Sequence, residues 1–161
     1  MKVRIVAAIL FIFALTSCRS KSAFNYSQAI VKIEQSMGPD IVTTEEKLDT
    51  YLTNGSYDSA LVASQRMEII VDNKIKEVEA LKTPDVKEAD NFRAATLRYF
   101  SYIKSIYTAY NDFILQASEE DREQARIRLL AVVDKKATAL QDMQQAQLKY
   151  AQANGFRLDK K

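Results

Sequence analysis

One segment of the sequence, residues 84–117, most constrains the fold, because its apolar residues repeat at helical spacing. The repeat alternates steps of three and four residues through Ala89, Phe92, Thr96, Tyr99, Ile103, Ile106, Tyr110, Phe113 and Ala117. A second row, formed by Phe100, Tyr107 and Ile114, lies beside the first and widens the apolar face. This pattern predicts a long helix that packs along its length against other helices at shallow angles.

The same criterion predicts three further helical segments: residues 25–53, 56–82 and 118–156. The first contains Gly38-Pro39, and proline inside a helix removes a hydrogen bond and clashes with the preceding turn, so this helix is predicted to be kinked or split there. Pro84 is expected in the first turn of the third helix. Ser56 and Ser118 are expected to cap the second and fourth helices. Three carboxylates follow Ser118, where the helix dipole favours negative charge.

These lengths and short connections define the expected fold class. Long helices joined by short connections pack antiparallel, so the sequence predicts an all-α, antiparallel up-down four-helix bundle. Apolar and polar residues do not alternate as a sheet requires, and no repeat of 20–50 residues indicates a solenoid.

The first residues have the layout of an export signal. Lys2 and Arg4 give a basic start, and an uncharged apolar run follows from Ile5 to Leu15. As a helix, this run measures roughly 16 Å, about half of a bilayer core, which suits a signal segment and is too short to span. Two alternatives stay open: a buried N-terminal helix ending in an ordinary cysteine, and an ordinary secretory signal that leaves Cys18 as a free thiol.

The segment Leu15-Thr16-Ser17-Cys18 resembles the lipobox of bacterial lipoproteins, with an aliphatic residue three before the cysteine and small residues between. The resemblance implies that the Cys18 thiol receives a diacylglyceryl group, that a peptidase cuts before Cys18, and that the new amine is acylated. Arg19 follows the cysteine, where sorting rules for such lipoproteins expect aspartate for retention at the inner membrane. The resemblance therefore implies lipid attachment at the outer membrane and leaves the leaflet open.

The expected organisation has four parts: a cleaved signal peptide, 1–17; a lipidated N-terminus and tether, 18–23; the bundle, 24–156; and a frayed tail, 157–161. The opening of the bundle, Phe24-Asn25-Tyr26-Ser27-Gln28-Ala29-Ile30-Val31, resembles that of a family of small helical surface lipoproteins. That family has no known active site, so the resemblance implies no functional residue.

Composition excludes several kinds of chemistry. The chain has no His, no Trp and a single Cys, so it lacks disulfides, Cys/His zinc sites, haem held by His and a proton-shuttling imidazole. Its three glycines are isolated and form no phosphate-binding loop. Removal of Lys2 and Arg4 with the signal leaves equal numbers of basic and acidic residues, so no nucleic-acid partner is expected. We therefore expect no enzyme, no metal, and no cofactor beyond the covalent lipid on Cys18.

Three hypotheses for function follow. The first is a non-enzymatic binding or structural module, held at a membrane by its lipid, that offers a helix face to an envelope protein partner. The alternative is a bundle that binds a small apolar ligand in a site lined by Tyr99, Tyr107 and Tyr110 of the third helix. The last is a carboxylate-only hydrolase, with Asp90, Asp112 and Asp134 as nominal candidates.

Three surface features complete the expectations. Tyr102 lies off the apolar seam and is expected to be exposed. The acidic residues 119–123 are attributed to dipole complementarity, since consecutive helical residues point apart and the glycine of a calcium loop is missing. The most plausible partner face is a row of glutamines on the last helix, Gln141, Gln144, Gln145, Gln147 and Gln152. The identity of partner or ligand and the oligomeric state stay open.

Overall fold

The computed structural model describes the backbone of residues 3–158 and the side chains of residues 19–158. Its helices are α1 (Val3–Thr53), α2 (Tyr57–Ala80), α3 (Ala89–Ile114), α4 (Glu119–Val133) and α5 (Lys136–Ala153), and no strand occurs between residues 3 and 158. The expected signal peptide, the lipobox residues Leu15, Thr16 and Ser17, and Cys18 itself lie outside the residues with described side chains.

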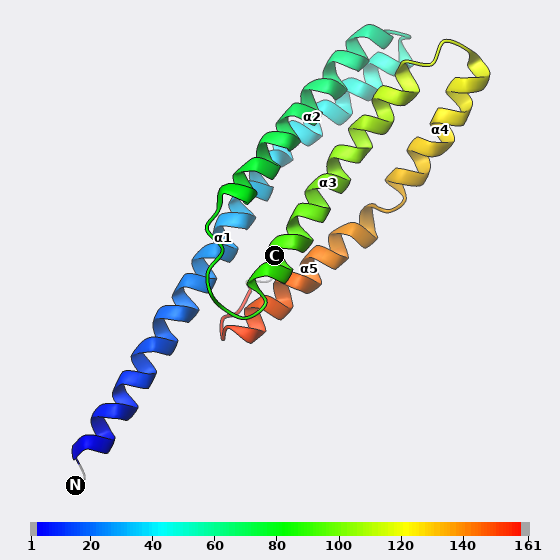
Figure 1. Ribbon diagram of the computed structural model, residues 1–161. Helices are drawn as coiled ribbons and strands as arrows, with labels where there is room; N and C mark the ends of the chain where they lie inside the picture. The colour runs from blue at the N-terminus through cyan, green and yellow to red at the C-terminus, as the bar shows by residue number, and fades with distance from the viewer. Residues whose placement is uncertain (1–2, 159–161) are drawn as a thin grey trace.

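The helices run up, down, up and down, with α4 and α5 together forming the last descending leg (Figure 1). Helix α3 packs against α2, α4 and α5, whereas α1 packs mainly against α2 and meets α5. The predicted all-α, antiparallel up-down four-helix bundle is therefore confirmed. We call the end that holds the α2–α3 connection and the end of α5 the lower end, as in Figure 1, and the opposite one the upper end.

Helix α1 departs from the sequence prediction at both places where a boundary was expected. It continues through Gly38 and Pro39, so of the two predicted alternatives, a kink or a split, the split does not occur. Pro39 is exposed, and the fully buried Met37 and Leu48 attach α1 to the core on either side of it. Packing thus offsets the cost of proline. Residues 19–23, expected to be a tether, are already helical, and Ala23 is fully buried.

The last leg is bent at Asp134–Lys135, where the sequence predicted one continuous helix. The Lys135 N–H donates to Val132 O at 3.1 Å, a tightened three-residue turn. The Tyr102 hydroxyl donates to the carbonyls of Val132 and Val133, at 3.0 and 3.2 Å. The expectation that Tyr102 is exposed is therefore wrong, because this side chain is half-buried and fills the bend.

The connection between α2 and α3 is longer than predicted. Pro84 lies in this connection rather than in the first turn of α3, which begins at Ala89. Glu88 precedes α3 with a left-handed backbone, φ 61°. Leu81 and Val86 are half-buried against the lower core, so the connection folds across the lower end of the bundle.

The interior consists of two clusters. The upper core joins α1, α2 and α3, and its α3 members are Phe100, Ile103, Tyr107 and Ile114. The lower core joins residues 23–30 of α1 to α3 and α5 around Tyr26, Phe92 and Tyr150. Four residues of the predicted seam are buried, Ala89, Phe92, Thr96 and Ile103, and four are half-buried, Tyr99, Ile106, Tyr110 and Phe113. The row predicted to flank the seam, Phe100, Tyr107 and Ile114, is buried throughout.

Candidate functional site

Residues 23–30 of α1 are held in the lower core. Ala23 and Tyr26 are buried, and the Tyr150 hydroxyl of α5 donates to Ala23 O at 3.1 Å. The Tyr26 ring meets Phe92 and Tyr150 edge-on, with centroids 6.3 and 6.1 Å apart. Phe92 and Tyr150 stack at 5.2 Å. The folded domain therefore begins no later than Ala23, five residues after Cys18 in the sequence.

A surface cavity of about 340 Å³, broadly open to solvent, lies at the lower end beside this docked segment. It is lined by Arg19, Ser20, Val86, Lys87, Ala153 and Asn154. Asn154 Nδ2 donates to Lys87 O at 2.9 Å and to Tyr150 O at 2.8 Å, so the side chain of Asn154 ties the α2–α3 connection to α5. Arg19 and Lys87 supply two positive charges to the cavity, and none of its lining residues is acidic.

A second cavity, of about 190 Å³, lies between α1 and α2. Its lining includes Tyr51 and Val62 together with the charged Asp40, Lys47 and Arg66. Val62 is 66% exposed, so this is a shallow surface hollow rather than an enclosed pocket. Nothing in its lining points to a particular ligand.

The three tyrosines predicted to line a ligand site, Tyr99, Tyr107 and Tyr110, lie along α3. The rings of Tyr107 and Tyr110 stack with centroids 6.4 Å apart, and the ring of Tyr99 contacts that of Phe100 at 6.1 Å. Tyr99 precedes Tyr107 by eight residues and therefore lies about two helical turns from the stacked pair. Burial, and secondarily Glu45 of α1, raises the pKa of the Tyr107 hydroxyl far above its usual value. Neither of the two cavities above is lined by any of the three. Their observed role is to pack against the upper core.

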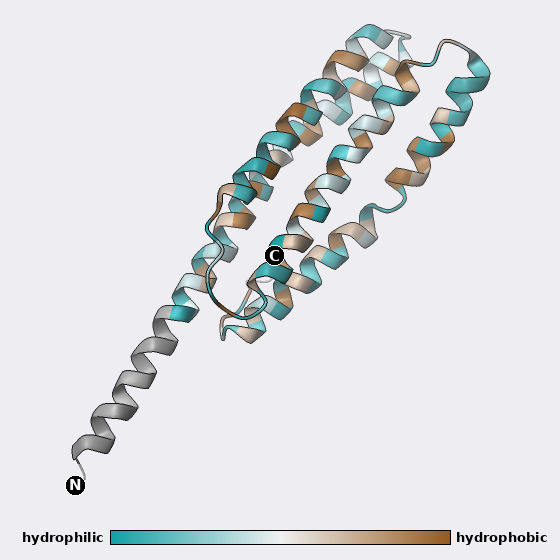
Figure 2. Ribbon diagram, in the orientation of Figure 1, coloured by the Kyte–Doolittle hydropathy of each residue, from teal (hydrophilic) through white to brown (hydrophobic). Residues whose placement is uncertain are grey.

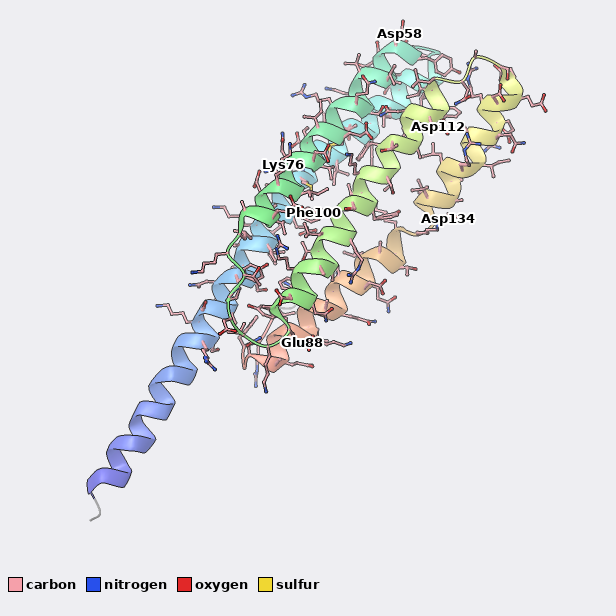
Figure 3. The ribbon with its side chains drawn as sticks, viewed as in Figure 1. Asp58, Lys76, Glu88, Phe100, Asp112 and Asp134 are labelled. Carbon is pink, nitrogen blue, oxygen red and sulfur yellow. The ribbon has the colours of Figure 1, made fainter. Side chains whose placement is uncertain are left out.

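The three carboxylates named for a hydrolase are also apart. Asp90, Asp112 and Asp134 are all exposed, and Asp112 forms an ion pair with Arg128 at 2.8 Å. Figure 3 shows Asp112 near the upper end and Asp134 at the bend between α4 and α5. They do not face one another across a cleft lined by the described residues.

Acidic residues at the start of α4 serve the helix itself. The Asp121 N–H donates to the Ser118 hydroxyl at 3.0 Å, which is the predicted cap. Glu119 and Glu123 pair with Arg122 and Arg126, one turn on, at 2.8 and 2.6 Å. Between residues 19 and 158, no group of three or more His, Cys, Asp or Glu side chains is arranged to hold a metal ion.

Most of the predicted glutamine face is solvent-exposed. Gln141, Gln144, Gln145 and Gln152 are exposed, whereas Gln147 turns inward and donates to the Ser27 hydroxyl at 3.3 Å. Leu148 lies among the exposed glutamines and is itself 48% exposed. Helical spacing places residues 141, 144, 145, 148 and 152 on one side of α5.

Helix α4 adds exposed apolar residues that the sequence analysis did not single out. Ile127 and Leu130 are 50% and 48% exposed, because α4 buries only Ala125 and Leu129 and packs chiefly on α3. Figure 2 shows the hydrophobic turns of α4 just before the bend. Together with the glutamine row and Leu148, they form what we call the outer face of α4–α5. A partial signal was present in the sequence, as α4 has more apolar residues than one buried side requires.

A polar ladder joins α2 to α3 and was not anticipated. The buried Ser64 hydroxyl donates to Asn111 Oδ1, and Asn111 Nδ2 donates to Glu68 Oε2 at 2.7 Å. Glu68 also accepts from the Thr108 hydroxyl, and one turn lower Lys104 pairs with Asp72 at 2.9 Å. These contacts set the register of the two helices, which is a structural role.

Comparison with known proteins finds no match to a protein-family model, a curated protein or a solved structure. The resemblances of the lipobox and of residues 24–31 to lipoproteins therefore stay predictions. Within the described part of the chain, every helix is too short or too polar to cross a bilayer.

Proposed function

We propose that this protein is an envelope lipoprotein, anchored to the outer membrane through acylated Cys18, whose bundle is a non-enzymatic binding or structural module. The observation that carries the proposal is the sequence Leu15-Thr16-Ser17-Cys18, placed directly before a domain that is folded by Ala23. A diacylglyceryl group supplies two acyl chains, and each buried methylene contributes about 0.8 kcal/mol to membrane binding. Two chains make a stable anchor where one holds only marginally.

The proposed binding role uses the outer face of α4–α5. Around half-exposed Leu148 the exposed neighbours are uncharged glutamines, and amides are cheaper to bury than charges. Half-exposed Ile127 and Leu130 extend the apolar surface onto α4, beside the ion-paired Arg126 and Arg128. Helix α2 also exposes two apolar residues seven apart, Val62 and Ile69, but the charged Arg66 lies between them, whereas Leu148 lies among uncharged glutamines. We propose an envelope protein as the partner of this face.

The anchor is tested by cell fractionation. The parent protein is expected in the detergent-soluble membrane fraction, and Cys18→Ala is expected to be released or to accumulate with its signal uncleaved. Membrane association of Cys18→Ala as mature-length protein would contradict the anchor.

The partner face is tested by photo-crosslinking in intact cells, with a reactive residue at Leu148 or, as the control, at Val62 of α2. Val62 is 66% exposed and lies outside the outer face. A discrete crosslinked species from Leu148 but not from Val62 is expected. The same profile from both positions would show that the outer face has no dedicated partner.

A further inference from the structure

The bundle is electrically polar along its length. At the upper end, residues 45–60 and 110–124 carry the acidic side chains Glu45, Glu46, Asp49, Asp58, Asp112, Glu119, Glu120, Asp121 and Glu123 and the basic side chains Lys47 and Arg122. Figure 3 shows Asp58 at the tip of this end and Asp112 below it on α3. Arg126 and Arg128 pair with Glu123 and Asp112 and so lie at this end too, which leaves nine acidic residues against four basic ones.

The lower end has the opposite balance. Residues 19–24, 79–90 and 149–158 carry the basic side chains Arg19, Lys21, Lys82, Lys87, Lys149 and Arg157 and the acidic side chains Glu79, Asp85, Glu88 and Asp90. No ion pair joins any of these basic residues to another described residue. Arg19 and Lys87 converge on the 340 Å³ cavity, whose lining has no carboxylate.

The lower end is also the end next to Cys18. Residues 19–23 are helical, so Arg19 and the buried Ala23 are separated by about 6 Å of helix. The thirty residues from Ala23 to Thr53 place the upper end about 45 Å farther along α1. At physiological ionic strength the Debye screening length is about 8 Å. The charges of a membrane at Cys18 therefore act on the side chains of the lower end and not on those of the upper end.

We propose that the lower end of the bundle, around the cavity between Arg19 and Lys87, binds an anionic phospholipid surface. This inference rests on the proposed anchor at Cys18, because the anchor is what brings the lower end to the membrane. Guanidinium and ammonium groups recognise phosphate oxygens, and the cavity gives a headgroup room to enter between the two. The acidic upper end then faces away from the anionic leaflet.

The contact is tested without the lipid, using a chain that begins at residue 19. This chain keeps every buried side chain described, from Ala23 to Ala151, and so retains the whole core. Its cosedimentation is measured with vesicles of phosphatidylcholine alone and of phosphatidylcholine mixed with phosphatidylglycerol. Binding to the anionic vesicles alone is expected at low ionic strength, with weakening as salt is raised.

The decisive variant is Arg19→Gln/Lys87→Gln. A basic residue close to an anionic surface contributes about fivefold to membrane partitioning, so the double variant is expected to bind about 25-fold more weakly. The matched control is Lys32→Gln/Lys135→Gln, since both lysines are exposed and lie away from the lower end. This control is expected to bind like the parent chain, and circular dichroism verifies that both variants stay helical.

The outcomes separate this inference from the anchor. Equal binding of the parent and Arg19→Gln/Lys87→Gln, or no binding of the parent to anionic vesicles, would overturn the lower-end contact and leave lipidation of Cys18 untouched. An unmodified Cys18 in cells, in contrast, would remove the anchor without changing the result with vesicles.

Discussion

Phe92→Ala is expected to destabilise the domain by about 3–5 kcal/mol, the usual cost of removing a fully buried aromatic ring. The Phe92 side chain is 0% exposed, stacks on Tyr150 at 5.2 Å and meets Tyr26 edge-on at 6.3 Å. Its removal would leave a cavity where α1, α3 and α5 meet and would delete two ring pairs worth about 0.5–1.5 kcal/mol each. Against a typical total of about 5–15 kcal/mol, this is a large fraction of the free energy of unfolding.

The measurement is urea unfolding followed by circular dichroism, with the slope of the transition checked for constancy. At about 3 °C per kcal/mol, the melting temperature should fall by about 10–15 °C. Phe24→Ala is the matched control, because Phe24 is 39% exposed and makes one edge contact, with Phe156 at 5.7 Å. It should cost about 1 kcal/mol. If Phe92→Ala costs no more than Phe24→Ala, the docking of α1 onto α3 and α5 is wrong.

Three further predictions follow from named contacts. Tyr102→Phe removes the hydroxyl that closes the α4–α5 bend, so we expect a loss of about 1 kcal/mol and about fivefold faster amide exchange in α4; unchanged exchange would exclude the clamp. Burial raises the pKa of Tyr150 to about 12 and also raises that of Tyr107. The stability that depends on these neutral hydroxyls should therefore be complete below the unfolded pKa of about 10 and decline as pH rises toward 12. Tyr150→Phe should make the fall in melting temperature over this pH range smaller. Ser118→Ala should cost about 1 kcal/mol in urea unfolding, whereas Ser56→Ala, whose hydroxyl makes no capping bond, should cost little; equal costs would contradict the assigned caps.

The helices and their antiparallel order were predictable from sequence because the apolar spacing is long and regular. Spacing alone does not say which of two adjacent rows faces the neighbours. Phe100, Tyr107 and Ile114 form the buried row because α3 packs against α2 on one side and against α4 and α5 on the other. That choice depends on tertiary packing, so the predicted seam is buried at Ala89, Phe92, Thr96 and Ile103, whereas toward the end of α3 the flanking row is the buried one.

The interruptions of the helices were predicted less well than the helices themselves, and the physical reason differs between α1 and the α4–α5 bend. Proline at position 39 reads locally as a break, yet buried neighbours on both sides hold α1 together. The bend at Asp134–Lys135 has no glycine or proline to mark it, and its stabilising partner, Tyr102, is 30 residues distant in sequence. A contact of that range has no local signature.

In the candidate site too, the features that lie close in sequence were predicted and those that depend on the fold were not. The lipobox before Cys18 is a local pattern and was found from sequence. Arg19 of α1 and Lys87 of the α2–α3 connection line one cavity, although they are far apart in the sequence. Only the folded structure shows that they lie close together. The exposed side of α4 could not be predicted either, because Ile127 and Leu130 are of the residue types found in cores. They are exposed because α4 packs chiefly on α3.

Mass spectrometry of the protein purified from membranes tests the central claim most directly. The mature chain is expected to begin at Cys18, to lack residues 1–17, and to carry a diacylglyceryl group on the thiol with a further acyl group on the amine. A chain that retains residues 1–17, or an unmodified Cys18 thiol, would contradict it.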